Sequence, residues 1–254
     1  MTIHLYTLCF NEMDILPFCV DYWKRFASHV TVYDNGSTDG SVEFLQHFDW
    51  IEVRSFQTDG MDTQKQTDIK NQAWKESKGK ADWVVVCDTD ELLFSNHLEE
   101  VLKEMQDGGY TALGCKWYQL LGDDKPQYEE GKLLHELIPR VAEQQINNQD
   151  KTIGKILLFN PNAVESTNYG VGCHAISPNG NYRLYKTDKA LIVHVEKGFG
   201  IDYKLQGFKE RNERRSNKNK QRGFGTHYAK SEAVLSEEYK KLIDKSVDIN
   251  QVIK

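Results

Sequence analysis

The chain of 254 residues lacks an uninterrupted apolar run of about 18 residues, the length that a membrane-spanning helix requires. It does not open with a basic segment, an apolar stretch and a cleavage site, so we expect no secretion signal. The chain is acidic overall, with a net charge of −6, which argues against a nucleic-acid binder. These absences predict a cytoplasmic protein that makes no contact with nucleic acid.

Cysteine is also scarce: the five thiols are odd in number, widely spaced and often within apolar, strand-like segments. Reduced, buried thiols explain this pattern better than disulfides or a zinc site. No internal repeat or low-complexity linker divides the chain. Its length suits one large α/β domain and is too short for two. We therefore expect a single domain over residues 1–254, with a weak boundary near residue 109.

The N-terminal segment has the pattern of a strand, a helix and a second strand. Residues 3–10 and 30–33 are apolar runs, and residues 15–26 place apolar side chains at helical spacing. The second strand ends in the polar turn Asp34-Asn35-Gly36-Ser37-Thr38-Asp39-Gly40-Ser41. Such a unit is right-handed, so both strands should end at the same edge of a parallel sheet.

The apolar run at residues 83–87 ends in three carboxylates within four residues, Asp88, Asp90 and Glu91. Clustered carboxylates repel one another unless a cation neutralises them, and hard oxygen ligands suit Mg²⁺ or Mn²⁺. The alternative is a solvated acidic turn in which Asp90 caps the next helix. If the strands are parallel, this exit and the two N-terminal loops share the rim where α/β proteins bind nucleotides.

These motifs resemble the family 2 glycosyltransferases. The resemblance is carried by Asn11-Glu12, by the turn that begins at Asp34-Asn35, and by Asp88-Thr89-Asp90-Glu91 after Ala81-Asp82-Trp83. Weaker matches follow at Lys116-Trp117-Tyr118, Lys155-Ile156-Leu157 and His227-Tyr228-Ala229-Lys230-Ser231. The resemblance implies the GT-A fold, a three-layer α/β sandwich around a mainly parallel sheet. It also implies a donor-binding half over residues 1–109 and an acceptor-binding half with a helical C-terminal part over 110–254.

Such enzymes move a sugar from a nucleotide-diphosphate sugar, here first of all a UDP-sugar, to a glycan or lipid-linked acceptor, as in surface polysaccharide synthesis. A bound Mn²⁺ or Mg²⁺ stabilises the charge of the departing diphosphate. The resemblance assigns the metal to Asp90, with Asp88 on the ribose or a metal-bound water, while Glu91 either joins them or stabilises the next loop. His174, in a glycine-containing turn, is a further metal candidate with a purely structural alternative.

The expected contacts to the nucleotide sugar come from the loops after the first strands and from one helix. Asn35 stands where many relatives have a second Asp, which leaves the identity of the base open. Asn71 is equally well explained as an exposed helix residue. The full set of expected nucleotide-sugar contacts is Thr7, Asn11, Glu12, Asp34, Asn35, Asn71 and Asp88.

Inverting transfer also requires a general base that accepts the proton of the acceptor hydroxyl. The candidates are Asp123, Asp124 and Glu136, and Glu136 fits best by its position between Trp117 and Arg140. Trp117 and Tyr118 either stack on a sugar ring or pack in the core.

A basic stretch over residues 204–222 contrasts with the acidic whole. It is either a solvated helix face, a clamp on donor phosphate, a grip on an anionic acceptor, or a peripheral contact to anionic lipid.

Two other functions remain open beside the glycosyltransferase: a nucleotidyltransferase, and a carbohydrate-binding protein that has kept the fold without activity. The glycine-rich loop of a nucleotidyltransferase is not visible near Asn11, and the intact Asp-Thr-Asp argues against lost activity. Further expected strands are 50–56, 110–121, 155–159 and 190–195, and further expected helices are 63–78, 98–105, 203–220 and 231–245.

Overall fold

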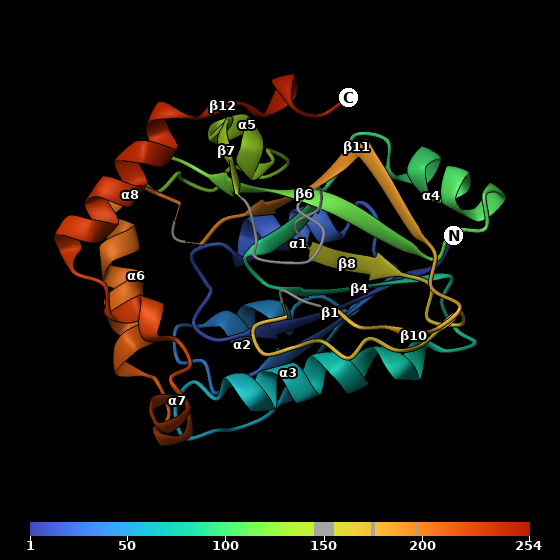
Figure 1. The fold of residues 1–254 in the computed structure, drawn as a ribbon, viewed down its shortest axis with the longest axis horizontal. Helices are drawn as coiled ribbons and strands as arrows, with labels where there is room; N and C mark the ends of the chain where they lie inside the picture. The colour runs from blue at the N-terminus through green and yellow to red at the C-terminus, as the bar shows by residue number, and fades with distance from the viewer. Residues whose placement is uncertain (145–154, 174–175, 197) are drawn as a thin grey trace.

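The central sheet of the computed structural model is built from strands of both halves of the chain (Figure 1). The structure describes residues 1–144, 155–173, 176–196 and 198–254. The elements of the first half are β1 (Ile3–Cys9), α1 (Leu16–Trp23), β2 (His29–Asp34), α2 (Ser41–Leu45), β3 (Ile51–Ser55), α3 (Thr63–Gln72), η1 (Ala73–Ser77), β4 (Trp83–Asp88), β5 (Glu91–Phe94) and α4 (Leu98–Asp107). Those of the second half are β6 (Ala112–Leu120), α5 (Leu134–Leu137), β7 (Arg140–Gln144), β8 (Lys155–Phe159), β9 (Val164–Ser166), β10 (Asn179–Gly180), β11 (Leu184–His194), α6 (Ile201–Glu213), α7 (Asn217–Arg222), η2 (Thr226–Ala229), α8 (Glu232–Asp244), β12 (Val247–Asp248) and η3 (Ile249–Gln251).

The first four strands run parallel, with β1 between β4 and β2 and with β3 on the outer side of β2. Their register brings the strand ends together, because Cys9 lies beside Asp34 and Leu8 lies beside Asp88. The two loops and the acidic motif predicted to share one rim therefore do so.

Alternating side chains of β4 fill two separate cores, one on each face of the sheet. Val85 and Cys87 pack in the core that also holds the apolar side chains of α1 and α4. Val84 and Val86 pack on the other face with Trp74 of η1. Each buried valine contributes roughly 1.5–3 kcal/mol to folding. Helices thus cover both faces, and the expected α/β sandwich is confirmed.

The second half extends the sheet with both orientations. β6 is antiparallel to β8 and β7, whereas β11 is parallel to β6 and antiparallel to β5. The pairing of β11 with β5 sets His194 opposite Glu91, and the amide of Val195 donates to the carbonyl of Asp90 at 2.8 Å. The end of β11 is thereby attached to the acidic motif, although about 100 residues of chain separate them.

The single helix expected over residues 203–220 is wrong, because the chain turns between α6 and α7. Ser216 caps α7 by accepting a hydrogen bond from the amide of Asn219 at 3.1 Å. The turn also pairs with Met61, whose amide donates to the carbonyl of Arg214 and whose carbonyl accepts from the amide of Ser216. A helix cannot continue through residues whose backbone groups bond to another segment.

The loop before α3 is held against this turn by further reciprocal contacts, which we call the α3–α7 clamp. The amide of Thr63 donates to Asn219 Oδ1, and Asn219 Nδ2 donates to Thr63 Oγ1. Gly60 has a φ of +69° and lies so close to the Arg214 carbonyl that a Cβ there would stand 2.2 Å from its oxygen. In the described part of the chain, no helix is both long and apolar enough to span a bilayer.

Candidate functional site

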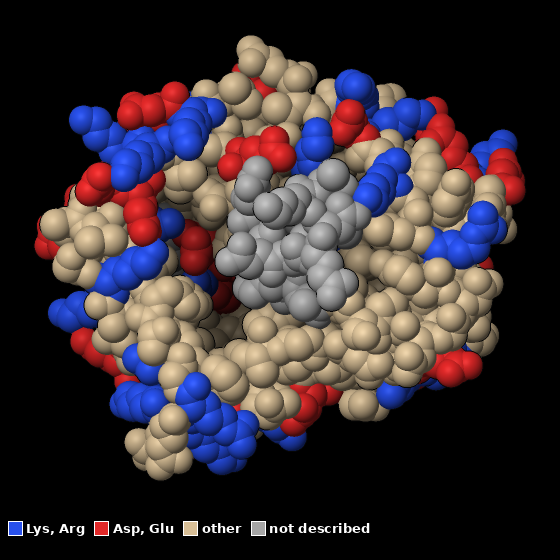
Figure 2. Space-filling model, in the orientation of Figure 1, with Lys and Arg blue, Asp and Glu red and all other residues tan. Residues whose placement is uncertain are grey.

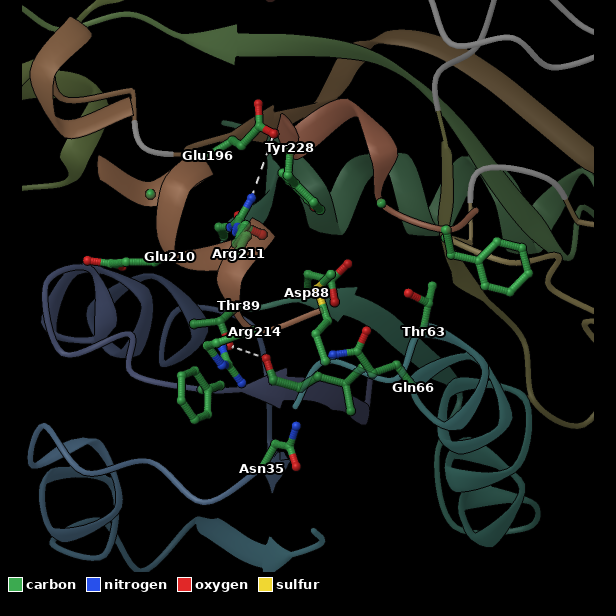
Figure 3. A pocket seen from close by; sticks show the side chains of 18 of the residues that line it. Asn35, Thr63, Gln66, Asp88, Thr89, Glu196, Glu210, Arg211, Arg214 and Tyr228 are labelled. Atoms are coloured by element: carbon green, nitrogen blue, oxygen red, sulfur yellow. Dashed lines mark hydrogen bonds and ion pairs between the residues drawn. The ribbon is translucent and has the colours of Figure 1, made fainter. Parts of the chain in front are cut away.

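A cavity of about 770 Å³ opens at the edge of the sheet where β1, β2 and β4 end. The loops that follow these strands form one wall, and α6 with residues 223–228 forms the opposite wall. Figure 2 shows acidic side chains deep in a hollow of this face, and Figure 3 shows side chains from both walls converging on the cavity. The cavity therefore lies at the carboxyl ends of parallel strands, where α/β proteins bind ligands.

Asp88 faces this cavity and is paired with Lys70 of α3. The Lys70 Nζ lies 2.6 Å from Asp88 Oδ1, and only 7% of the lysine side chain is exposed, against 37% for the aspartate. Burial raises the pKa of Asp88, but the Lys70 charge outweighs it, so this pKa lies well below the ordinary value. Asp88 is thus an ionised carboxylate with a built-in positive partner.

Asp90 is paired with two basic side chains from the second half of the chain. Arg211 of α6 donates to Asp90 Oδ2 at 3.1 Å, and His194 Nε2 lies 3.6 Å from the same oxygen. Burial raises the pKa of Asp90, but the charges of His194 and Arg211 lower it further, and the net pKa is below the ordinary value. Asp90 therefore stays ionised at neutral pH.

Glu91 has a different environment from the two aspartates. It forms a buried ion pair with Lys155 of β8, whose side chain is 3% exposed against 2% for the glutamate. Its other oxygen accepts a hydrogen bond from the amide of Asp88 at 3.3 Å. Of the two roles open to Glu91, these contacts favour stabilisation of the motif over binding of a metal.

Glu196 follows β11 and enters the cavity beside Asp90. Its carboxylate lies 3.7 Å from Arg211 (Figure 3). It also lies 3.6 Å from Lys204 Nζ and 3.9 Å from His194 Nδ1. Burial raises the pKa of Glu196, but these three charges lower it below its ordinary value. The residue adopts a φ of +23°, in the left-handed region that non-glycine residues rarely occupy. Sequence reasoning missed Glu196, although it follows the predicted strand at 190–195, as Asp88 follows its own strand.

A family model extends over both walls of this cavity. The model of glycosyltransferase family 92 matches residues 4–231. The chain belongs to glycosyltransferase family 92. It therefore carries a glycosyltransferase domain, as the motifs predict. Membership of family 2 is not confirmed, because the matching model is that of family 92.

No curated protein matches this glycosyltransferase significantly. Among solved structures, S. aureus TarS is similar with a TM-score of 0.48 and 15% identity, over 83% of this chain and 39% of that one. S. aureus TarS 1-349 in complex with UDP is similar with a TM-score of 0.46 and 13% identity, over 83% of this chain and 65% of that one. The same protein in complex with UDP-GlcNAc is similar with a TM-score of 0.44 and 13% identity, over 83% of this chain and 66% of that one. The chain thus spans 39% to 66% of these proteins, and similarities of this size assign neither donor nor acceptor.

The structure brings four of the predicted nucleotide-sugar contacts to the cavity wall: Asn11, Glu12, Asn35 and Asp88. Asn35 is held in place by Thr58, with which it exchanges hydrogen bonds of 3.0 and 3.1 Å. These residues come from the loops that the sequence analysis selected, and their use in donor binding remains a prediction.

Three other predicted contacts lie behind the wall and serve the fold in this structure. Thr7 is buried, with its hydroxyl 3.3 Å from that of Thr89. The Asp34 carboxylate accepts hydrogen bonds within its own turn, from the amide of Gly36 among others. Asn71 is not an exposed helix residue, because its amide group bonds to the backbone of Tyr169 at 2.7 and 3.2 Å. Its predicted contact with the nucleotide has no support from this placement.

The predicted general bases lie away from the cavity. Glu136 is exposed, and its carboxylate accepts a hydrogen bond from the amide of Leu133 at 2.6 Å, which caps the short helix α5. Asp124 is exposed in the loop after β6 and does not line the cavity. Asp123, also exposed, is paired with Arg140 at 2.5 Å. The third metal candidate, His174, lies outside the described residues.

Asp88 and Asp90 are the residues that fit a divalent cation. Within the described ranges, no cluster of three or more His, Cys, Asp and Glu side chains is arranged to hold a metal ion. Mg²⁺ and Mn²⁺ do not require such a cage, since they are often held by one or two carboxylates with substrate phosphates and water. Two ionised carboxylates facing one cavity are sufficient for this kind of metal binding. Their ion pairs with Lys70 and Arg211 offset their negative charge when no metal is bound.

The basic stretch divides between the cavity and the outer surface. Arg211 and Arg214 line the cavity, and Lys204 is buried behind it. Burial and the neighbouring charge of Arg211 lower the pKa of Arg214 to about 10. The exposed members are Lys209, Lys218, Lys220 and Arg222, and Figure 2 shows basic side chains gathered over α7. A single solvated helix face is therefore excluded, because the stretch has two environments.

Proposed function

We propose that this glycosyltransferase moves a sugar from a nucleotide-diphosphate sugar, with a UDP-sugar as the first to test, to a hydroxyl of a glycan or lipid-linked acceptor. The observation that carries the proposal is the joint presence of Asp88, Asp90, Arg211 and Arg214 on one cavity at the end of the parallel strands. Carboxylates that fit a metal and arginines that bind phosphate are the two components that a diphosphate requires.

The proposed donor lies along the cavity from the first loops towards α6. The nucleoside would contact Asn11 and Asn35, and the diphosphate would lie between the acidic motif and the arginines. Arg214 suits a phosphate because burial and the charge of Arg211 lower its pKa only to about 10, so it stays charged at neutral pH, and an anion would offset both effects. The charges of Arg211 and Arg214 would then stabilise the leaving diphosphate as the sugar departs.

We further propose that Asp90, assisted by Asp88, holds Mn²⁺ or Mg²⁺. When bound, such an ion neutralises the charge that develops on the diphosphate as the bond to the sugar breaks. The resemblance in the motifs implies a single displacement, so an α-linked donor would give a β-linked product. The anomeric proton of the product, observed by NMR, tests this stereochemistry, and retained configuration would contradict it.

The decisive experiment measures UDP binding by calorimetry with and without Mn²⁺, in the wild type and in Asp90→Asn. The variant keeps the size of the side chain and removes its charge, so Mn²⁺-dependent affinity should fall at least about tenfold, since even outer-shell partners of metals typically contribute 10–100-fold. Asp107→Asn, an exposed position at the end of α4, is the matched control. Unchanged Mn²⁺-dependent affinity in Asp90→Asn, with an unaltered circular dichroism spectrum, would remove the metal from this site.

For the cellular location we propose the cytoplasm, where nucleotide sugars are available, with the acceptor presented at the inner face of a membrane. The five cysteines are free and buried, as expected for a protein that carries reduced thiols. The exposed basic residues of α6 and α7 are the proposed contact with anionic lipid, at about 1 kcal/mol for each side chain close to the surface.

A further inference from the structure

Glu196 differs from the carboxylates of the acidic motif, Asp88, Asp90 and Glu91, in what its own carboxylate contacts. Asp88 forms an ion pair with Lys70, Asp90 accepts a hydrogen bond from Arg211, and Glu91 accepts one from Lys155. Nitrogens of Lys204, Arg211 and His194 surround Glu196 at 3.6 to 3.9 Å, which is beyond hydrogen-bond distance. In the described ranges its oxygens accept no hydrogen bond, although they face the cavity.

The position of Glu196 also separates it from the expected nucleotide site. Figure 3 shows Asn35 and Glu196 at opposite ends of the view, with Asp88 and Arg211 between them. Arg211 contacts both Asp90 and Glu196, so Glu196 is one guanidinium away from the motif proposed to hold the diphosphate. A group beyond the diphosphate, on the side away from the nucleoside, lies where the sugar and its acceptor must meet.

The cavity next to Glu196 also suits a sugar ring. Trp117 lines it and is partly exposed, and its ring lies 4.9 Å from that of His194. Tyr228 lines the opposite wall beneath Arg211. Flat aromatic faces next to a carboxylate form a common carbohydrate-binding arrangement, because they contact the apolar face of the sugar while the acid bonds to a hydroxyl.

We infer that Glu196 is the general base of the transfer reaction, in place of Glu136 and Asp124. This inference rests on the proposed function. The acceptor hydroxyl gives its proton to the Glu196 carboxylate while its oxygen forms a bond to the anomeric carbon. The bond between that carbon and the diphosphate oxygen breaks, and its electron pair leaves with the diphosphate. The surrounding cations keep Glu196 ionised before the reaction, and the rare backbone conformation holds the side chain at this point.

Donor hydrolysis tests the assignment without knowledge of the acceptor, because water then takes the place of the acceptor hydroxyl. UDP-N-acetylglucosamine, UDP-glucose and UDP-galactose are each incubated with the wild-type protein and Mn²⁺, and the release of UDP is followed. Glu196→Gln should lower turnover by roughly 10²–10⁴-fold, the usual contribution of a general base, with UDP affinity within about threefold of wild type. Glu165→Gln, at an exposed position in β9 remote from the cavity, is the matched control.

A second variant separates proton transfer from the positioning of Arg211. Glu196→Ala leaves space for formate, which should restore part of the turnover in proportion to its concentration, whereas formate should not accelerate Glu165→Ala. This readout also serves if Glu196→Gln does not fold.

Three results overturn the base assignment: turnover of Glu196→Gln within about threefold of wild type, loss of UDP binding together with turnover, or no rescue of a folded Glu196→Ala by formate. If the wild type neither binds UDP nor hydrolyses any of the three donors, the proposed donor fails instead, so the two failures are distinguishable.

Discussion

Replacement of Lys155 by methionine should destabilise the protein strongly, because it leaves Glu91 charged and buried without a partner. Both side chains of this ion pair are no more than 3% exposed. Removing one member of a buried ion pair typically costs about 3–5 kcal/mol, more than the pair itself contributes. For a chain of this size each kcal/mol lowers Tm by roughly 2–4 °C, so Lys155→Met should melt about 6–20 °C below wild type.

The double variant Glu91→Leu/Lys155→Met should recover most of this loss. It removes both charges and keeps apolar volume in the core, a change that is often neutral. The hydrogen bond from the Asp88 amide to Glu91 is also lost, so a deficit of about 1 kcal/mol should remain. The difference between the single and double variants isolates the cost of the unpaired charge.

The pH dependence of the stability that Lys155 gives to the wild type follows from the direction of its pKa. Burial lowers the pKa of Lys155, but Glu91 and Asp88 raise it further, and its net pKa is above the ordinary value of 10.5. A lysine whose pKa is raised on folding contributes stability that is fully present below its pKa in the unfolded chain. This stability is lost only as the pH rises through its pKa in the folded protein. Between pH 7 and 9 the contribution of charged Lys155 to the stability of the wild type should therefore be constant.

The assay is urea denaturation followed by circular dichroism, with Lys103→Met as the control at an exposed position of α4. The control should change the free energy of unfolding by no more than about 0.5 kcal/mol. If Lys155→Met and Lys103→Met differ by less than about 1 kcal/mol, the pair is not buried as described and Glu91 is available for another role.

Two further predictions concern Glu136 and the exposed basic residues of α7. Glu136→Gln should leave donor hydrolysis within about threefold of wild type. It should cost about 1 kcal/mol of stability, because it weakens the hydrogen bond that the amide of Leu133 donates to this side chain. A loss of turnover at unchanged stability would instead identify Glu136 as the general base. The protein should co-sediment with vesicles containing phosphatidylserine at low salt and be released at high salt, and Lys220→Glu/Arg222→Glu should weaken this binding. Absence of binding at low salt would assign the exposed basic residues to solvent.

Local patterns predicted the N-terminal half of the fold well. The strands ending at Cys9, Asp34 and Asp88 are continuous apolar runs, and their parallel arrangement follows from the helix between each strand and the next. The motif carboxylates at Asp88 and Asp90 were found because a polar cluster directly after a buried strand is visible in the sequence itself.

The partners of these carboxylates were not predictable, because they come from distant segments. Lys70 is in a helix whose exposed and buried faces the sequence does not distinguish clearly, and Arg211 is one of several basic residues in a row. The break before α7 depends on Met61, which is more than 150 residues away. The short strand β5 consists of four residues that follow β4 almost directly, and only its pairing with β11 defines it. Tertiary contacts of this kind have no local signature.

The α3–α7 clamp has a consequence for how the protein acquires its activity. Thr63 and Asn219 are separated by 156 positions, and the opposite walls of the cavity are joined through them and through Arg211. During synthesis, the first half of the chain leaves the ribosome with its acidic motif but without Arg211, which pairs with Asp90 in the folded protein. A nascent chain should therefore expose Asp88 and Asp90 to solvent until α6 and α7 have emerged and docked, and the proposed nucleotide binding would begin only at that late stage of folding.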